Sequence, residues 1–208
     1  MSKKNYRIVS VIIGLSLLSQ VGCASSKPSR FYVLSALSPV ERPSEKQGIA
    51  VGIGPIEFPK YLDRPQIVTR SSQNRLHFGE FDRWAEPLEQ NFARVLTENL
   101  STLLATDDVV QYPWKRSTRI DYQIIVTVNQ FDASIGGDTV LHARWTVNDA
   151  EGHPLVAPQG SRIVEHAASM DYGAMVEAAS RAVEQLSRQI TSAILEIGSM
   201  PHHQGNGG

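Results

Sequence analysis

The sequence contains a single cysteine, Cys23, among 208 residues. It therefore cannot form a disulfide within the chain, and it cannot supply a cysteine-rich metal site. Neither sign of charge dominates, because 20 Lys and Arg residues stand against 21 Asp and Glu residues. The basic excess that is typical of nucleic-acid-binding proteins is absent, so no nucleic-acid partner is predicted. Apolar residues make up 41% of the chain, which excludes wholesale disorder.

The apolar run near the N-terminus is too short to cross a membrane. Ile8–Leu18 has eleven residues, whereas a transmembrane helix needs about 20. The run follows three basic residues, Lys3, Lys4 and Arg7, and no acidic one. A charged start followed by a short apolar stretch is typical of a secretory signal peptide.

The lone cysteine lies where this signal peptide would be cleaved. The residues Gln20-Val21-Gly22-Cys23 resemble a bacterial lipobox, although most lipoboxes have Leu where this chain has Gln20. The resemblance implies lipidation of Cys23, cleavage before it, and anchoring by acyl chains such as palmitate. We therefore expect a lipoprotein signal peptide over residues 1–22 and a flexible tether over residues 23–29. An ordinary signal peptide with an incidental cysteine is the alternative.

The residue after the cysteine bears on the membrane to which the protein is sorted. In the lipoprotein-sorting pattern that the motif resembles, Asp at this position retains a protein at the inner membrane, and this chain has Ala24. We expect a lipid-anchored protein on the periplasmic face of the outer membrane of a Gram-negative cell. Removal of residues 1–22 takes away three positive charges and brings the net charge from −1 to −4.

The rest of the chain alternates between strand and helix patterns. Two stretches carry one continuous apolar stripe at helical spacing, residues 87–104 and 172–197, the second with Asp171 as a plausible N-cap. Strands are predicted over residues 30–37, 48–58, 66–70, 75–78, 109–112, 120–131, 139–148 and 162–168.

These patterns predict a single α+β domain over residues 30–198, with a mostly antiparallel sheet and both amphipathic helices packed on one of its faces. Parallel pairing between the strands that flank the first helix is left open. Residues 199–208 are expected to form a disordered tail.

No arrangement typical of an enzyme is found. None of the six histidines has the HExxH spacing of a zinc site, and no G-x-S-x-G elbow is present. We therefore predict a non-enzymatic protein with no catalytic residue, no metal site and no cofactor.

The segment Phe58–Leu88 combines aromatic and arginine side chains, which are enriched at protein interfaces. Within it, Tyr61, Arg64, Arg83 and Trp84 are the candidate partner-binding residues. In the alternative interpretation, Trp84 covers the core beside the first helix, and Arg83 pairs with Asp82 or Glu86.

Two stretches of this segment, YLDRPQIVTR at residues 61–70 and RWAEPL at residues 83–88, resemble the PqiC-type ABC-transport auxiliary lipoproteins, as does FYVL at residues 31–34. The resemblance implies a lipid-anchored accessory subunit whose partner is an MCE-domain protein, with a homo-oligomer possible. MCE-domain proteins form periplasmic tunnels for phospholipid traffic between the two membranes. The alternative function is a periplasmic lipoprotein that itself binds a lipid or a small molecule.

Overall fold

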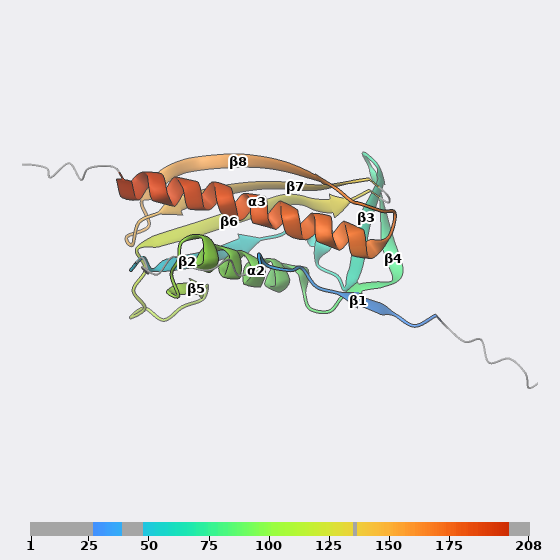
Figure 1. Ribbon diagram of the computed structural model, residues 1–208, viewed down its shortest axis with the longest axis horizontal. Helices are drawn as coiled ribbons and strands as arrows, with labels where there is room; N and C mark the ends of the chain where they lie inside the picture. Colours follow the sequence, from blue (N-terminus) through green and yellow to red (C-terminus); the bar gives the residue numbers. More distant parts are fainter. Residues whose placement is uncertain (1–26, 39–47, 135–136, 200–208) are drawn as a thin grey trace, which may run out of the picture.

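The computed structural model describes residues 27–38, 48–134 and 137–199. The predicted signal peptide, Cys23 and most of the tether and C-terminal tail lie outside these residues. The described chain forms one sheet of eight strands with two long helices (Figure 1). The strands are β1 Arg30–Tyr32, β2 Val51–Glu57, β3 Gln66–Ser72, β4 Arg75–Trp84, β5 Val109–Gln111, β6 Tyr122–Ala133, β7 Asp138–Asn148 and β8 Pro154–His166. The helices are α2 Leu88–Leu103 and α3 Tyr172–Ser199, and a single 3-10 turn, η2, spans Lys60–Leu62.

The sheet branches at β6, and its strand order is β1-β4-β3-β6-β2-β5, with β7 and β8 added beside β6. The long pairings β6–β7 and β7–β8 are antiparallel, as is the β3–β4 hairpin. Shorter parallel pairings join β1 to β4, β2 to β5, β2 to β6 and β3 to β6. The predicted single α+β domain is confirmed, and its sheet is mixed. β4 and β5, the two strands that flank α2 in the sequence, do not pair with each other.

Both helices cover the same face of the sheet (Figure 1). Phe92 and Leu96 of α2 and Leu186 and Ile190 of α3 are fully buried over the sheet, in one cluster with Ile124 of β6. The predicted cap of the second helix is confirmed, because the backbone N–H of Ala174 donates to Oδ1 of Asp171 at 3.0 Å. Burying two apolar stripes on one sheet face produces a single core.

The first strand was predicted over residues 30–37, but β1 ends at Tyr32. The backbone of the remaining residues donates hydrogen bonds to side chains and not to a neighbouring strand. Leu34 is nevertheless buried in the core. The backbone N–H groups of Leu34 and Leu37 donate to the side-chain oxygens of Asn91 and Asn99 on α2. A strand-like sequence is therefore extended here without a neighbouring strand.

Two other strands are longer than predicted. β4 continues to Trp84 through a wide irregularity, since Gln66 pairs with Arg83 and Val68 pairs with Phe78. The extra residues in β4 break the alternation on which the prediction relied. β8 begins at Pro154, and its first half carries mostly exposed side chains without an apolar face.

Candidate functional site

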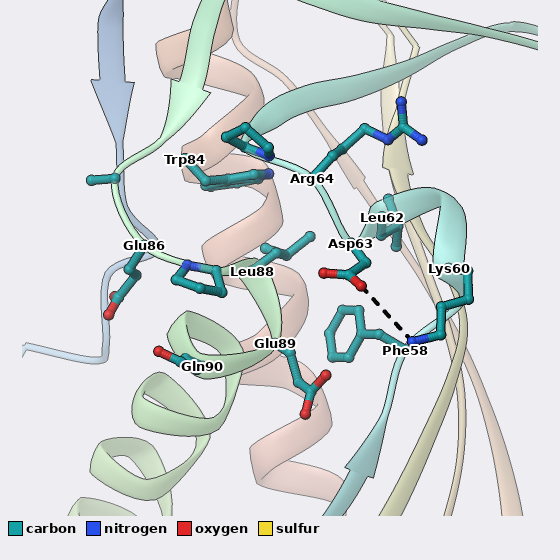
Figure 2. Close-up of a pocket in the computed structure, with 13 residues that line it drawn as sticks. Phe58, Lys60, Leu62, Asp63, Arg64, Trp84, Glu86, Leu88, Glu89 and Gln90 are labelled. Atoms are coloured by element: carbon teal, nitrogen blue, oxygen red, sulfur yellow. Dashed lines mark ion pairs between the residues drawn. The ribbon is translucent and has the colours of Figure 1, made fainter.

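The two stretches that resemble a known family meet at one groove of about 530 Å³ (Figure 2). We call it the α2 groove, because the first turn of α2 forms part of its wall. One wall comes from the segment after β2 and the other from the junction of β4 and α2. The lining residues are Phe58, Lys60, Leu62, Asp63, Arg64, Pro65, Trp84, Ala85, Glu86, Pro87, Leu88, Glu89 and Gln90.

Backbone hydrogen bonds within η2 and between the two walls shape the groove. In η2 the N–H of Leu62 donates to the carbonyl of Pro59 at 2.9 Å, which turns the chain after β2. The N–H of Trp84 donates to the carbonyl of Pro65 at 2.7 Å and joins the two walls. Leu62 and Leu88 are both buried at the groove. The α2 groove is therefore built on the hydrophobic core and on backbone hydrogen bonds.

Tyr61 does not line the groove but attaches its wall to the sheet. Its hydroxyl donates to Oδ2 of Asp132 at 2.9 Å, and Arg70 binds both oxygens of the same carboxylate at 3.0 and 2.7 Å. The Asp132 side chain is only 1% exposed. Burial, followed by the nearby Asp132 carboxylate, raises the pKa of Tyr61 to about 12. Tyr61 is therefore a neutral donor that holds η2 in place.

Arg64 lies at the rim of the groove and is held in a defined position. Its Nε donates to the carbonyl of Tyr61 at 2.8 Å, and its Cζ lies 4.1 Å from the centre of the Phe78 ring. This cation–π contact leaves the guanidinium available along its edge. Phe78 itself is 40% exposed. Together the two side chains present a flat apolar and cationic surface beside the groove.

Trp84 lines the groove and also belongs to the core, as its 8% exposure shows. Arg83 is half-buried and does not line the groove, and its Nε is buried without a hydrogen-bond partner among the described residues. The alternative ion pairs of Arg83 are not formed, because Arg30 binds Asp82 and Arg94 binds Glu86.

The structure thus places Trp84 in the groove wall and Arg64 at the rim, and Tyr61 and Arg83 do not line the groove. Glu89 and Gln90 also line the groove, although the sequence analysis did not single them out. Proline favours the first position of a helix, so Pro87 indicates that Glu89 and Gln90 lie in the first helical turn, next to residues 83–88. This proximity was the signal that could have identified them.

Charges along the groove are mixed. Nζ of Lys60 lies 3.8 Å from Oδ2 of Asp63, and Arg94 binds Oε1 of Glu86 at 2.8 Å (Figure 2 shows the first pair). Glu89 is exposed at the start of α2. A groove with an apolar floor and a rim of both charge signs suits a polypeptide segment.

The strand that follows the predicted tether is fixed to the sheet beside this region. Arg30 makes two hydrogen bonds to the buried Asp82, at 2.7 and 2.8 Å, and the hydroxyl of Tyr32 donates to the same carboxylate at 2.9 Å. The hydrogen bonds to Asp82 raise the pKa of Arg30. These contacts hold β1 against β4, whose last residue is Trp84.

One cluster has the composition of a metal site. Ligand atoms of Asp149, Glu151 and His153 lie within 4.8 Å of one another. Asp149 Oδ1 accepts the backbone N–H groups of Glu151 and His153 at 3.0 and 2.8 Å. These bonds close the turn between β7 and β8, which gives the cluster a structural role. The expected absence of metals and cofactors stays a prediction.

Within the described residues, no helix combines the length and the apolar character that crossing a bilayer requires.

Comparison with solved structures identifies relatives of the same fold. A protein of Xanthomonas campestris superposes with a TM-score of 0.67 at 16% identity, over 82% of this chain and 97% of that protein. A crystal structure of an uncharacterized protein gives the same TM-score at 20% identity, over 81% of this chain and 99% of the other. At these identities the similarity shows the fold alone.

Sequence comparison is more specific. The chain is 24% identical over 139 residues to the intermembrane transport lipoprotein PqiC of Escherichia coli K12, which covers 66% of this chain and 73% of that protein. PqiC of Shigella flexneri matches equally well. The profile of the ABC-type transport auxiliary lipoprotein component matches residues 32–191, most of the described domain. The chain therefore belongs to the ABC-type transport auxiliary lipoprotein family.

Proposed function

We propose that this protein is a non-enzymatic outer-membrane lipoprotein subunit of an MCE-type intermembrane lipid transport system. In this role it holds the periplasmic end of an MCE tunnel at the membrane. The observation that carries the proposal is that parts of the two family-like stretches, residues 62–65 and 84–88, lie in the two walls of one groove. The name of the PqiC relatives, intermembrane transport lipoprotein, agrees with it.

The anchor in this proposal is Cys23. Seven residues, 23–29, separate the acylated end from β1, and a fully extended chain of that length spans at most about 25 Å. Two or three acyl chains on one residue suffice for stable anchoring. The body would therefore stay close to the bilayer, with β1 fixed to β4 through Asp82.

The α2 groove is the docking site for the MCE-domain partner. Its floor is apolar through Leu62, Trp84 and Leu88, and its rim carries exposed charged residues. Aromatic anchors surrounded by a polar rim are the arrangement that supplies most binding energy at protein interfaces. A homo-oligomeric ring around the tunnel is a further prediction, which the mass of the purified protein in solution will test.

Filling the groove tests the proposal. Ala85 is exposed and lines it, so Ala85→Trp adds bulk without removing a buried contact. We expect this variant to lose co-purification with the MCE-domain protein of the same cell. Ala157→Trp, at an exposed position that lines a different surface hollow, is the matched control. Equal recovery of the partner with both variants would remove the groove from the proposal.

Charge reversal at the rim of the α2 groove is a second test of the same docking site. Arg64→Glu replaces the cation above Phe78 with an anion, and we expect weaker co-purification. Arg83→Glu is less informative, because Arg83 is half-buried and its loss would disturb the packing.

The alternative function, a lipid carried by the domain itself, needs a hollow between the sheet and the helices. An open hollow between β7, β8 and α3, lined by Trp145, Leu155 and Ile197, has a volume of about 590 Å³. The hollow bordered by β3, β6 and α3, lined by Ile67, Phe131 and Met175, has a volume of about 20 Å³. That is roughly the room a single water molecule needs. Mass spectrometry of the purified protein, extracted under denaturing conditions, tests this alternative, which predicts one lipid per domain beyond the acyl chains of Cys23.

A further inference from the structure

The face of the sheet opposite the helices carries unpaired arginines. In β7, Leu141, Ala143 and Trp145 are buried under the helices, so His142 and Arg144 face the other way, and both are exposed. In β8, Ile163 is buried and Arg162 is exposed. We call the surface formed by His142, Arg144 and Arg162 the outer face.

The outer face brings His142 and Arg162 together across two neighbouring strands. His142 is the register partner of Arg162 across the β7–β8 pair. Directly opposed side chains have Cβ atoms about 5 Å apart, so both can contact the same ligand. Neither Arg144 nor Arg162 forms an ion pair with any described residue. Two exposed guanidinium groups without an internal ion pair indicate a binding role.

Nearby acidic groups are already bound or too distant. Arg70, Tyr61 and Gln130 donate to Asp132, and His166 lies 3.1 Å from Asp138. Glu57 also lies on the outer face. It is the register partner of Thr127, and Thr127 is the register partner of Arg144, so the backbones at Glu57 and Arg144 are two strands, or about 10 Å, apart. The arginine charges are therefore left for a ligand outside the chain.

Beside Arg144 the surface is flat and open. Gly160 is its register partner, and a Cβ built at Gly160 would meet nothing within 4 Å. Val164, which follows Arg162 on the same face, is 41% exposed. A broad, shallow surface of arginines and small or apolar residues differs from a pocket that would enclose one small anion.

The same face carries an aromatic and basic loop. Gly52 alternates with the buried Val51 and Ile53, and the Trp114 ring lies over it, so Trp114 covers the outer face at β2. Lys115 and Arg116 follow Trp114 and are exposed. Tryptophan together with Lys and Arg is the combination that favours the headgroup region of a bilayer.

We propose that the outer face binds the headgroup layer of a membrane containing anionic phospholipid. The proposal rests on the proposed function only in that a lipid anchor brings the body to a bilayer. Arg144, Arg162, Lys115 and Arg116 supply attraction to lipid phosphates, and Trp114 lies at the interface. The groove at α2 would then stay available for the MCE-domain partner.

The test uses the mature chain, residues 23–208, with Cys23→Ala, so that no acyl chain contributes to binding. Every described strand and helix lies within this chain. We expect it to sediment with vesicles of phosphatidylcholine containing phosphatidylglycerol, and not with phosphatidylcholine alone. Each basic residue near an anionic membrane contributes about fivefold in affinity. The double variant Arg144→Gln/Arg162→Gln should therefore bind about 25-fold more weakly.

The matched control removes two arginines from α3, on the other side of the sheet, by Arg181→Gln/Arg188→Gln, and should bind as the parent chain does. The Arg144/Arg162 variant should melt within a few degrees of the parent, because neither arginine forms an ion pair with a described residue and both are exposed. Absence of binding to the anionic vesicles, or equal weakening by both double variants, would overturn the proposal. An acidic protein ligand would give the first of these results. Because no MCE-domain protein is present, failure here is distinguishable from failure of the groove experiment.

Discussion

The hydroxyl of Tyr61 reaches the carboxylate of Asp132 at 2.9 Å, across 71 positions of sequence. One residue belongs to the turn behind the α2 groove, and the other to the end of β6 at the branch of the sheet. Arg70 and Gln130 bind the same carboxylate, and the four side chains form a cluster around the buried Asp132 that sets the position of the groove wall.

Breaking this cluster should destabilise the whole domain. Asp132→Ala leaves the guanidinium of Arg70 and the hydroxyl of Tyr61 without their buried acceptor, so we expect a loss of about 3–5 kcal/mol in the free energy of unfolding. Tyr61→Phe removes one hydrogen bond and should cost about 1 kcal/mol. Urea denaturation measures both values. Asp63→Ala, at an exposed position, should change stability by less than about 0.5 kcal/mol, and a similar loss there would contradict the assignment.

The same cluster predicts a dependence on alkaline pH. The pKa of Tyr61 is raised from 10.0 to about 12 in the folded protein, so folding favours the neutral phenol. The stabilisation is complete below pH 10 and is lost as the pH rises toward 12. The difference in unfolding free energy between the parent and Tyr61→Phe should thus shrink across this range. A difference that stays constant up to pH 11.5 would show that Tyr61 titrates normally.

Gly52 is required because of Trp114. A Cβ at position 52 would lie 2.8 Å from Cη2 of the indole, too close for an unmoved ring. We expect Gly52→Ala to displace Trp114, to lower stability by about 1–3 kcal/mol, and to shift the tryptophan fluorescence. Gly160→Ala is the control, since that strand glycine has open space around it. Loss of stability in the control alone would refute the explanation.

Asn99 should be essential to the packing of residues 33–38. Its side chain is fully buried, accepts the N–H of Leu37 at 2.8 Å and donates to Oγ of Ser187 on α3 at 3.1 Å. Asn99→Ala leaves buried polar groups unpaired and should cost about 1–3 kcal/mol. Hydrogen exchange should then accelerate at the Leu37 amide first. Gln90→Ala, exposed on the same helix, should leave that amide unchanged.

Replacing Cys23 tests the anchor directly. Cys23→Ser should abolish incorporation of labelled palmitate and move the protein from the membrane fraction to the soluble periplasmic fraction. Residual weak association that disappears at high salt would fit the outer-face proposal, because salt screens attraction to lipid phosphates. Unchanged, salt-resistant membrane association would show that Cys23 is not the anchor.

Local patterns in the sequence were enough to predict both helices, the strands β6 and β7, the Asp171 cap and the α+β class. Each depends on periodicity or capping over a few neighbouring residues, and such signals survive without knowledge of the rest of the chain. The family resemblance also came from short stretches, 61–70 and 83–88, and the structure places residues 62–65 and 84–88 of them in the walls of one groove.

Tertiary structure decided the contacts between residues distant in sequence. Only the fold shows that Tyr61 faces Asp132 while Arg64 faces Phe78, that Asn91 and Asn99 replace a neighbouring strand for residues 33–38, and that Arg162 lies opposite His142. The parallel pairings of β2 and β1 were likewise settled at this level. Strand register and buried hydrogen bonds join segments tens of residues apart, and periodicity within one segment carries no information about its partner.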